Sequence, residues 1–191
     1  MTERQAEQPP LEFRPLVETD LVIVSDWLSA EHVRRWWRDP ADIGAVRAKY
    51  VPRIAGEEPT EVFMVALGDE PIGLIQRYRF SDYGKWAATV AGTDLVFPSA
   101  AGIDYLIGVD EHTGRGLGTE MIRSFTDRLF EEYADVRTIL VTPQHGNRAS
   151  CRALERAGYS LAWVGDLDSD DPADAGESAI YVKHRSDGVP A

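Results

Sequence analysis

The chain has 191 residues, of which 43% are hydrophobic and 27% are charged, values that are ordinary for one globular domain. A domain of this length buries roughly 70% of the surface that its unfolded chain exposes. The formal net charge of −12 argues against a nucleic-acid-binding protein, which takes most of its affinity from neutralised phosphates. The same charge suits a cationic ligand better.

Signals for export, membrane insertion and disulfide formation are missing from the sequence. Residues 1–10 are polar and end in two prolines, so we expect a disordered tail there and no signal peptide. No apolar run is as long as a membrane span. Cys151 is the only cysteine, and its amphipathic surroundings predict a buried structural thiol. We therefore expect a cytoplasmic protein that binds no membrane. We expect a monomer or a homodimer.

The first half of the chain predicts helices early and a hairpin after them. Residues 81–100 hold glycines, a proline and small residues, and predict a long irregular excursion, which is often functional in a compact domain. Periodicity and capping predict a strand at 11–16 and then three helices: one capped by Thr19, one at 32–37, and one that begins at Asp42 and is closed by Pro52 and Gly56. Two hairpin strands are expected after them, at 61–67 and 72–80.

The middle of the chain predicts a strand, a glycine-rich loop and a helix. Ile103, Tyr105 and Ile107 alternate with Asp104 and Leu106, which indicates a mostly buried strand. From Leu117 to Tyr133 the apolar residues recur at helical spacing.

The loop of this unit suits an anion such as a phosphate. Gly114, Gly116 and Gly118 let the backbone approach closely, and the first turn of the helix offers unpaired N–H groups. Arg115 adds a permanent positive charge. An isolated G-x-G-x-G pattern also fits an ordinary glycine-rich connection, so the loop alone leaves both interpretations open.

The C-terminal part alternates strands with a helix, which together with the first half predicts a mixed α/β sandwich around one sheet. We expect one domain over residues 11–185 and a flexible tail at 186–191. The remaining predicted elements are strands at 138–142, 159–163 and 177–184, a helix from Asn147 to Gly158, and a solvated acidic loop at 166–174.

Several blocks of sequence occur in an order that resembles a known family. They are residues 26–28 (DWL), 32–37 (HVRRWW), 70–73 (EPIG), 76–78 (QRY), 102–104 (GID), 114–119 (GRGLGT) and 147–159. The chain resembles the GNAT superfamily of acyl-coenzyme A-dependent N-acyltransferases, and within it the aminoglycoside 6'-N-acetyltransferase branch. The resemblance implies an α/β (α+β) fold whose mixed, largely antiparallel central sheet is flanked by helices and split near the acyl-CoA site.

The resemblance also implies acetyl-CoA as the cofactor. The strand end would pair its backbone with the pantetheine arm and polarise the acetyl carbonyl, and Asn147 and Arg152 would form a second arm of contacts. For Asn147 a plain helix cap is the alternative, and both roles can hold together. The implied cofactor-binding residues are Ile107, Gly108, Val109, Gly114, Arg115, Gly116, Leu117, Gly118, Thr119, Asn147 and Arg152.

Three positions depart from the family pattern. Thr113 stands where Gln or Arg is frequent, and Leu154 matches the tyrosine that often protonates the departing thiolate. Thr142 replaces the acidic residue that the aminoglycoside branch has before a proline. The last departure removes one expected contact to a polyamine.

Acyl transfer to an amine needs a neutral nucleophile, although a free alkyl amine has a pKa of about 10. A carboxylate can hold the ammonium group and accept its proton, directly or through water. Asp104 matches the acidic position of the branch and is the catalytic candidate; it could also only bind the acceptor or form a structural pair. Because no Ser/His/Asp or Cys/His arrangement is evident, we expect direct transfer in a ternary complex.

For the acceptor pocket the sequence offers aromatic residues and carboxylates, which suit a polycationic sugar. The histidines show no metal-ligand spacing, so no metal is expected. The alternatives are a siderophore-type lysine or hydroxylysine N-acyltransferase and a non-catalytic acyl-CoA-binding regulatory domain. The predicted acceptor residues are Trp36, Trp37, Gln76, Tyr78, Asp94 and Asp104.

Overall fold

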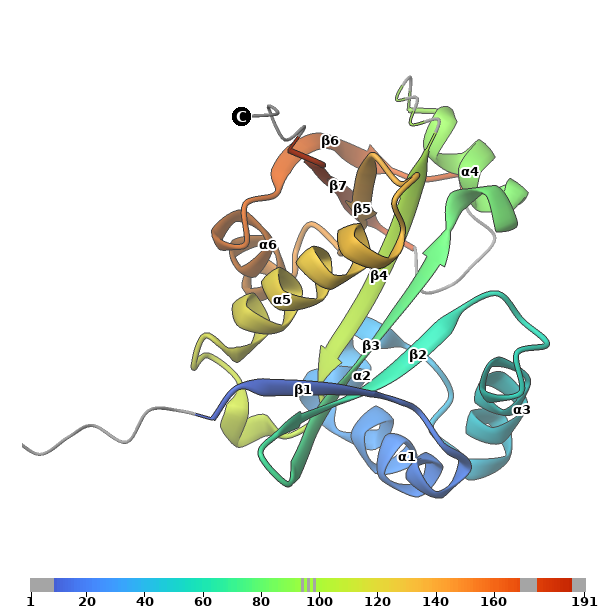
Figure 1. The fold of residues 1–191 in the computed structure, drawn as a ribbon, viewed down its shortest axis with the longest axis vertical. Helices are drawn as coiled ribbons and strands as arrows, with labels where there is room; N and C mark the ends of the chain where they lie inside the picture. The colour runs from blue at the N-terminus through green and yellow to red at the C-terminus, as the bar shows by residue number, and fades with distance from the viewer. Residues whose placement is uncertain (1–8, 94, 96, 98, 169–174, 187–191) are drawn as a thin grey trace, which may run out of the picture.

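Seven strands form one sheet in the order β1-β2-β3-β4-β5-β7-β6 (Figure 1). The computed structural model describes residues 9–93, 95, 97, 99–168 and 175–186. Nearly all of the two predicted tails, and most of the predicted acidic loop, lie outside these residues. The strands are β1 (Leu11–Pro15), β2 (Glu61–Leu67), β3 (Glu70–Arg79), β4 (Ala100–Ile107), β5 (Thr138–Val141), β6 (Ser160–Asp166) and β7 (Glu177–His184).

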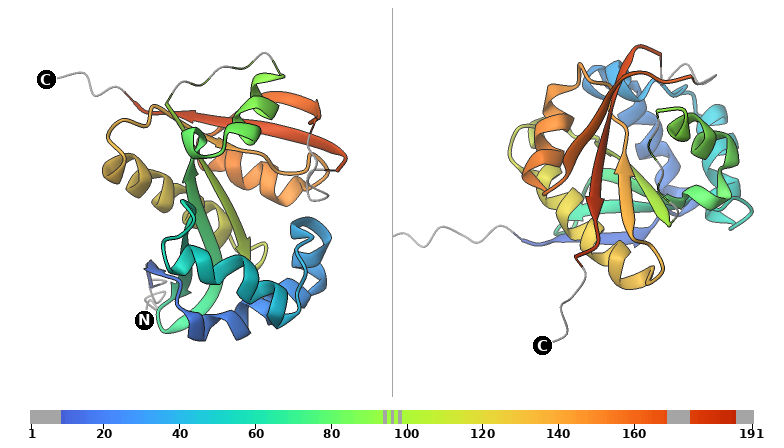
Figure 2. Two further views of the ribbon diagram at one scale, coloured as in Figure 1. Left: turned by 90° about the vertical axis from the view of Figure 1, so that its right-hand side faces the viewer. Right: turned by 90° about the horizontal axis from the view of Figure 1, so that it is seen from above.

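Every neighbouring pair of strands is antiparallel except β4 and β5, which are parallel. The predicted mixed, largely antiparallel sheet is therefore confirmed. β4 pairs with β3 as far as Ile107, but with β5 only from Ala100 to Gly102. Among the described residues, no strand pairs with the rest of β4 on the β5 side. The sheet splits at this point, as Figures 1 and 2 show.

The helices divide between the two faces of the sheet according to the alternation of the strands. Met64 and Leu74 face one hydrophobic cluster with α1, α2 and α3, whereas Val65 and Ile75 face a second cluster with α5 and α6. Figure 2 shows α4 beside β6 and β7, away from α1 and α3. The helices are α1 (Leu21–Ser29), α2 (Glu31–Trp37), α3 (Ile43–Ile54), α4 (Gly84–Ala91), α5 (Leu117–Glu132) and α6 (Arg148–Arg156).

Local signals explain where α3, α5 and α6 begin. The Asp42 carboxylate accepts the Ala45 N–H at 2.9 Å, and the Asn147 side chain accepts the Ser150 N–H at 3.2 Å. Both are ordinary N-caps, since a side-chain oxygen replaces the missing partner of a first-turn N–H group. Gly116, with φ at +87°, lets the chain turn sharply into α5.

Two predictions about elements are wrong. Residues 81–100 contain α4, because Gly84 and Gly92 stand at the ends of a helix rather than interrupting it. Thr19 does not cap α1: residues 18–20 form a 3₁₀ turn, and the Asp20 carboxylate accepts the Val17 N–H at 3.0 Å. α3 ends at Ile54, between Pro52 and Gly56, the two residues predicted to close it.

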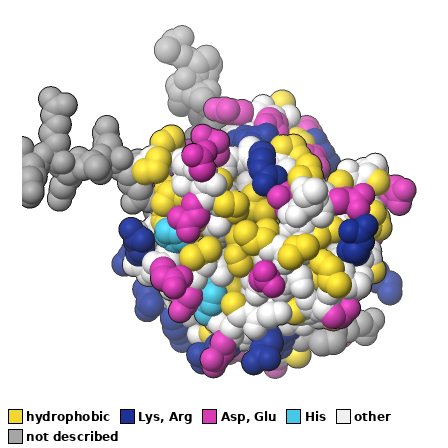
Figure 3. Space-filling view, turned by 90° about the horizontal axis from the view of Figure 1, so that it is seen from below, with side chains coloured by type: hydrophobic (Ala, Val, Ile, Leu, Met, Phe, Trp, Pro, Cys, Tyr) yellow, Lys and Arg dark blue, Asp and Glu magenta, His cyan; other side chains and the backbone are white. Residues whose placement is uncertain are grey.

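Charged side chains of both signs surround an apolar area on the face shown in Figure 3, where neither sign forms a large patch. The negative net charge of the chain is therefore not gathered on this face. None of the helices in the described part of the chain is long and apolar enough to cross a membrane.

Gly108 directly follows β4 and packs against the indole of Trp27. A Cβ atom at this position would lie 2.1 Å from Trp27 Cδ2, and Trp27 itself is buried. We therefore expect Gly108→Ala to lower the free energy of unfolding by about 1–3 kcal/mol, the usual cost of overpacking. Urea denaturation measures this change. Gly84→Ala is the control, because a Cβ there has nothing within 4 Å; an equal loss in both variants would contradict the explanation.

Candidate functional site

The split in the sheet holds a cavity of about 1230 Å³. Its walls come from α2, α3, α4 and α6, from β3 and β4, and from the turns that follow β4 and β5. The predicted site residues that line it are Trp36, Trp37, Gln76, Tyr78, Asp104, Ile107, Gly114, Gly116, Gly118, Thr119, Asn147 and Arg152. Asp94, also predicted for the acceptor pocket, lies outside the described residues.

The turn before α5 presents backbone N–H groups to the cavity. Gly114 and Gly116 have φ at +69° and +87°, a region that disfavours side chains. The first intrahelical bond of α5 runs from the Glu120 N–H to the Gly116 carbonyl at 3.1 Å, and no side chain of the described chain caps this turn. The N–H groups of residues 117–119 therefore remain available, which fits the phosphates of coenzyme A.

Side chains contribute less to this turn than its backbone does. Leu117 is buried in the core beneath α5, and Arg115 Nη1 lies 3.4 Å from His112 Nδ1. Neither side chain lines the cavity. Thr113, one of the departures from the family pattern, donates its hydroxyl to the Asp110 carbonyl at 2.8 Å and so closes the preceding 3₁₀ turn.

The open edge of β4 is the second backbone surface of the cavity. The N–H groups of Gly108 and Val109 both point to the Ile72 carbonyl on β3, at 2.8 and 3.4 Å. Because alternate residues of an antiparallel strand bond to opposite sides, Ile107 and Tyr105 direct their backbone groups away from β3. Of the three residues predicted at the strand end, only Ile107 presents its backbone to the cavity.

His32 confirms the orientation of Ile107. Its Nε2 lies 3.0 Å from the Ile107 carbonyl, and its Nδ1 lies 3.7 Å from the Asp110 carboxylate. A carbonyl only accepts, so Nε2 carries the hydrogen. The pair ties α2 to the end of β4, a connection between residues 75 positions apart that the sequence did not indicate.

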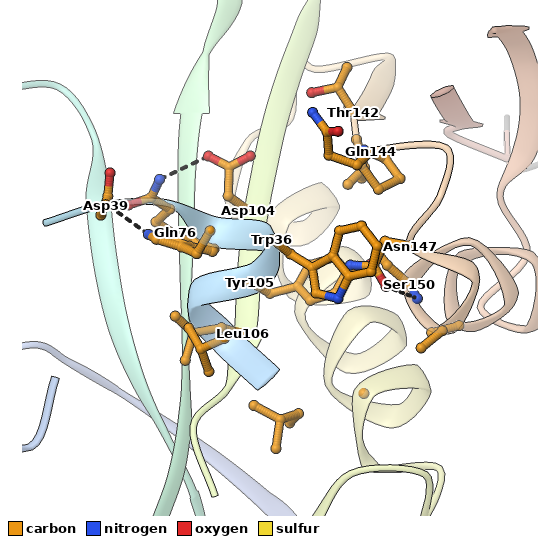
Figure 4. Close-up of a pocket in the computed structure, with 18 of the residues that line it drawn as sticks. Trp36, Asp39, Gln76, Asp104, Tyr105, Leu106, Thr142, Gln144, Asn147 and Ser150 are labelled. Carbon is orange, nitrogen blue, oxygen red and sulfur yellow. Dashed lines mark hydrogen bonds between the residues drawn. The ribbon is translucent and has the colours of Figure 1, made fainter. Parts of the chain in front are cut away.

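Asp104 is held by a chain of side chains on the α3 side of β4. Gln76 Nε2 donates to Asp104 Oδ2 at 2.8 Å (Figure 4). Arg53 Nη1 donates to Gln76 Oε1 at 3.0 Å. Since a guanidinium cannot accept, the orientation of the Gln76 amide is fixed. Arg53 in turn pairs with Glu58 at 3.0 Å. This Glu58–Arg53–Gln76 relay directs a donor, backed by a positive charge, at the carboxylate.

A second carboxylate, Asp39, stands at the far wall. Its carboxylate accepts a hydrogen bond from the Trp37 indole N–H at 2.6 Å and forms an ion pair with Lys49. Tyr50 is buried behind them, and burial together with the nearby Asp39 charge raises the pKa of its hydroxyl. Sequence reasoning missed Asp39, Lys49 and Arg53; the four-residue spacing of Lys49 and Arg53 along α3 was the one local signal.

Aromatic side chains form the walls between these polar groups. Trp36 stands between Asp104 on one side and Asn147 and Ser150 on the other (Figure 4). Tyr78 lies over β4 because Gly102 leaves room: a Cβ there would be 2.4 Å from its ring. Trp86 and Tyr83, from the segment predicted to be irregular, complete the walls.

The α6 side of the cavity is basic. Arg152, a predicted cofactor-binding residue, lines it, and so does Arg156, one helical turn further. Asn147 caps α6 and also lines the cavity, so the two interpretations of this residue are compatible. Thr142 lies at the rim together with Gln144 (Figure 4). Leu154, by contrast, is fully buried in the core. Within the described residues, no group of three or more His, Cys, Asp or Glu side chains could hold a metal ion.

Residues 16–167 match the family described as an acetyltransferase (GNAT) domain. The chain belongs to the GNAT acetyltransferase family. Over 152 residues it is 30% identical to the aminoglycoside N(6')-acetyltransferases type 1 of Klebsiella pneumoniae and Serratia marcescens. The matched region covers 77% of this chain and 72% of each relative. The family predicted from sequence is thus confirmed, and this GNAT protein is an acyltransferase that uses acetyl-CoA.

Solved structures support the same fold. A structure of AAC(6')-Ib with ribostamycin and coenzyme A has a TM-score of 0.78 and 26% identity, covering 92% of this chain and 94% of that chain. Another, with coenzyme A and kanamycin, has a TM-score of 0.74 and 25% identity, covering 92% and 95%.

The turn before α5 gives a testable prediction. We expect Gly116→Ala to weaken coenzyme A binding by about tenfold, because an alanine at positive φ costs of order 1–2 kcal/mol and shifts the N–H groups. Isothermal titration calorimetry measures the affinity. Gly56→Ala is the matched control, since Gly56 has φ at +73° and open space around it after α3. It should lose stability without losing affinity; equal affinities in both variants would argue against the turn as the phosphate site.

The Glu58–Arg53–Gln76 relay behind Asp104 gives a second testable prediction. Gln76→Leu removes one donor to Asp104 and leaves Arg53 Nη1 facing an apolar group. We expect kcat/KM for acetyl transfer to an amine acceptor to fall roughly 10- to 100-fold, the value of a charge-assisted hydrogen bond, while the affinity for coenzyme A stays the same. Glu58→Gln, at the exposed end of the relay, should change kcat/KM less than about threefold. Parallel losses in the two variants would mean that the relay acts only through local folding.

Proposed function

We propose that the enzyme transfers acetyl from acetyl-CoA to a primary amine of an aminoglycoside, its 6'-amine, by direct attack in a ternary complex. The observation that carries the proposal is Asp104, oriented by Gln76 inside the cavity of a chain that is 30% identical to aminoglycoside N(6')-acetyltransferases. In this proposal the amine binds beside Asp104, which takes up its proton directly or through water.

The acetyl carbonyl needs donors at its oxygen as charge develops there. The Ile107 N–H faces the cavity from the open edge of β4 and is our candidate for that role. The phosphates bind the N–H groups of residues 117–119, and Arg152 and Asn147 contact the cofactor from α6. The backbones of Gly108 and Val109, which bond to Ile72, support the strand end instead of binding the cofactor.

Aromatic walls and carboxylates support a cationic sugar. Trp36, Trp37 and Tyr78 offer flat apolar surface next to Asp104, and Asp39 adds a second carboxylate. Stacking and charge-assisted hydrogen bonds hold amino sugars in this way.

Thiol release from acetyl-CoA with kanamycin or tobramycin tests the proposal. We expect turnover on drugs with a 6'-amine, none on analogues with a 6'-hydroxyl, and a loss of about 10²- to 10⁴-fold in Asp104→Asn, the usual contribution of a general base. Binding of coenzyme A by Asp104→Asn should equal that of the parent chain. Tight coenzyme A binding without turnover on any aminoglycoside would overturn the assignment of the acceptor.

A second candidate acceptor is an amine that also carries a carboxylate, such as lysine or N6-hydroxylysine. Lys85 on α4 favours it, because this exposed cation lines the cavity and has no ion-pair or hydrogen-bond partner within the described part of the chain. Lys85→Ala would raise KM for a lysine-like acceptor and leave KM for an aminoglycoside unchanged or lower. The same panel of acceptors therefore separates the two candidates.

A further inference from the structure

The position that often carries the proton donor for the departing thiolate is occupied by a side chain without any polar group. Leu154 is fully buried in the core under α6 and does not line the cavity. Sulfur nevertheless leaves with a negative charge when a thioester is cleaved. A donor for that charge must therefore come from another residue or from water.

Tyr105 and Ser150 place hydroxyl groups at the opposite side of β4 from Asp104. The Tyr105 side chain packs on the face covered by α5 and α6, whereas its neighbour Leu106 packs with α1 and α3. The Tyr105 hydroxyl lies 2.7 Å from Ser150 Oγ, and both residues line the cavity. Figure 4 shows Tyr105 beside Trp36, and Ser150 on the α6 side, across that indole from Asp104.

Either hydroxyl of the pair can donate to the other. Burial raises the pKa of Tyr105, so its phenol keeps its proton and can donate to Ser150. When Tyr105 donates to Ser150 Oγ, the Ser150 hydrogen is free to point into the cavity. Ser150 also lies in the first turn of α6, where the helix dipole favours negative charge.

We propose that Ser150, oriented by Tyr105, donates a hydrogen bond to the sulfur of coenzyme A as it leaves. This inference rests on the proposed acetyl transfer but not on the identity of the amine. In the step, the amine nitrogen forms the C–N bond and the C–S bond breaks, with its electron pair staying on sulfur. The proton of the amine passes to Asp104 or water. Ser150 keeps its own proton and stabilises the thiolate, which water protonates after release.

A matched pair elsewhere in the chain separates this role from simple stability. Thr126 Oγ1 and the Tyr159 hydroxyl lie 2.6 Å apart in the buried core, and burial raises the pKa of Tyr159 as well. Neither residue lines the cavity. Tyr159→Phe and Thr126→Val therefore remove the same kind of bond, in a more deeply buried place, away from the sulfur.

The first measurement needs no turnover: the thiol of coenzyme A bound to the enzyme is titrated by its thiolate absorbance in the ultraviolet. A Ser150 donor stabilises the thiolate, so we expect the bound thiol pKa to rise by about one unit in Ser150→Ala. Tyr105→Phe should raise it less, because Tyr105 acts through Ser150. Ser150→Thr, which keeps the hydroxyl, should restore the value. The Tyr159→Phe and Thr126→Val controls should leave it unchanged.

Steady-state kinetics with the best acceptor then test the catalytic consequence. We expect kcat to fall roughly 10- to 100-fold in Ser150→Ala, with a smaller change in KM for acetyl-CoA. The Tyr159→Phe control should lower Tm and leave kcat unchanged.

The outcomes distinguish this inference from the choice of acceptor. A shifted thiol pKa together with inactivity on aminoglycosides would support Ser150 and overturn only the acceptor. An unchanged thiol pKa in both Ser150→Ala and Tyr105→Phe would overturn the role of Ser150, whatever amine is acetylated. Equal effects in the Tyr105 and Tyr159 variants would overturn it too, since they would mark a loss of folding stability alone.

Discussion

The site depends on the unequal lengths of two neighbouring parallel strands. β5 ends at Val141, shortly before Pro143, which has no N–H group to continue a ladder. β4 continues to Ile107, so its backbone beyond Gly102 loses the neighbour on one side. Unpaired backbone groups inside a protein are costly unless a ligand, water or side chain satisfies them. The open edge is therefore a surface suited to the amide groups of a pantetheine chain.

The same strand separates the two halves of the chemistry. Successive side chains of β4 point to opposite faces, so Asp104 meets Gln76 and the α3 side, while Tyr105 meets Ser150 on α6. In our proposals the proton of the amine leaves on one face and the charge of the sulfur is stabilised on the other.

The charge of the cavity differs from what the net charge of the chain suggests. A net charge of −12 favours a cationic acceptor. The cavity is nevertheless lined by charged side chains of both signs, among them Lys49, Arg53, Lys85, Asp39, Asp104 and Asp168. Lys49 and Arg53 each pair with a carboxylate. Local pairing therefore determines the potential that an acceptor meets, and Lys85 is the residue whose role distinguishes the two candidate acceptors.

The sequence alone determined the elements that depend on interactions between neighbours in the chain. Alternation along residues 103–107, the glycines of the following turn and the cap at Asn147 predict the strand, the anion-binding turn and α6, because periodicity and capping involve neighbours in the chain. Asp104 was found through its place in that unit and through its match to the acidic position of the family branch. Only the tertiary structure joined His32 to Ile107, Gln76 to Asp104 and Tyr105 to Ser150, which lie 75, 28 and 45 residues apart. Strand register and helix packing bring such partners together, and neither leaves a periodic signal in one sequence.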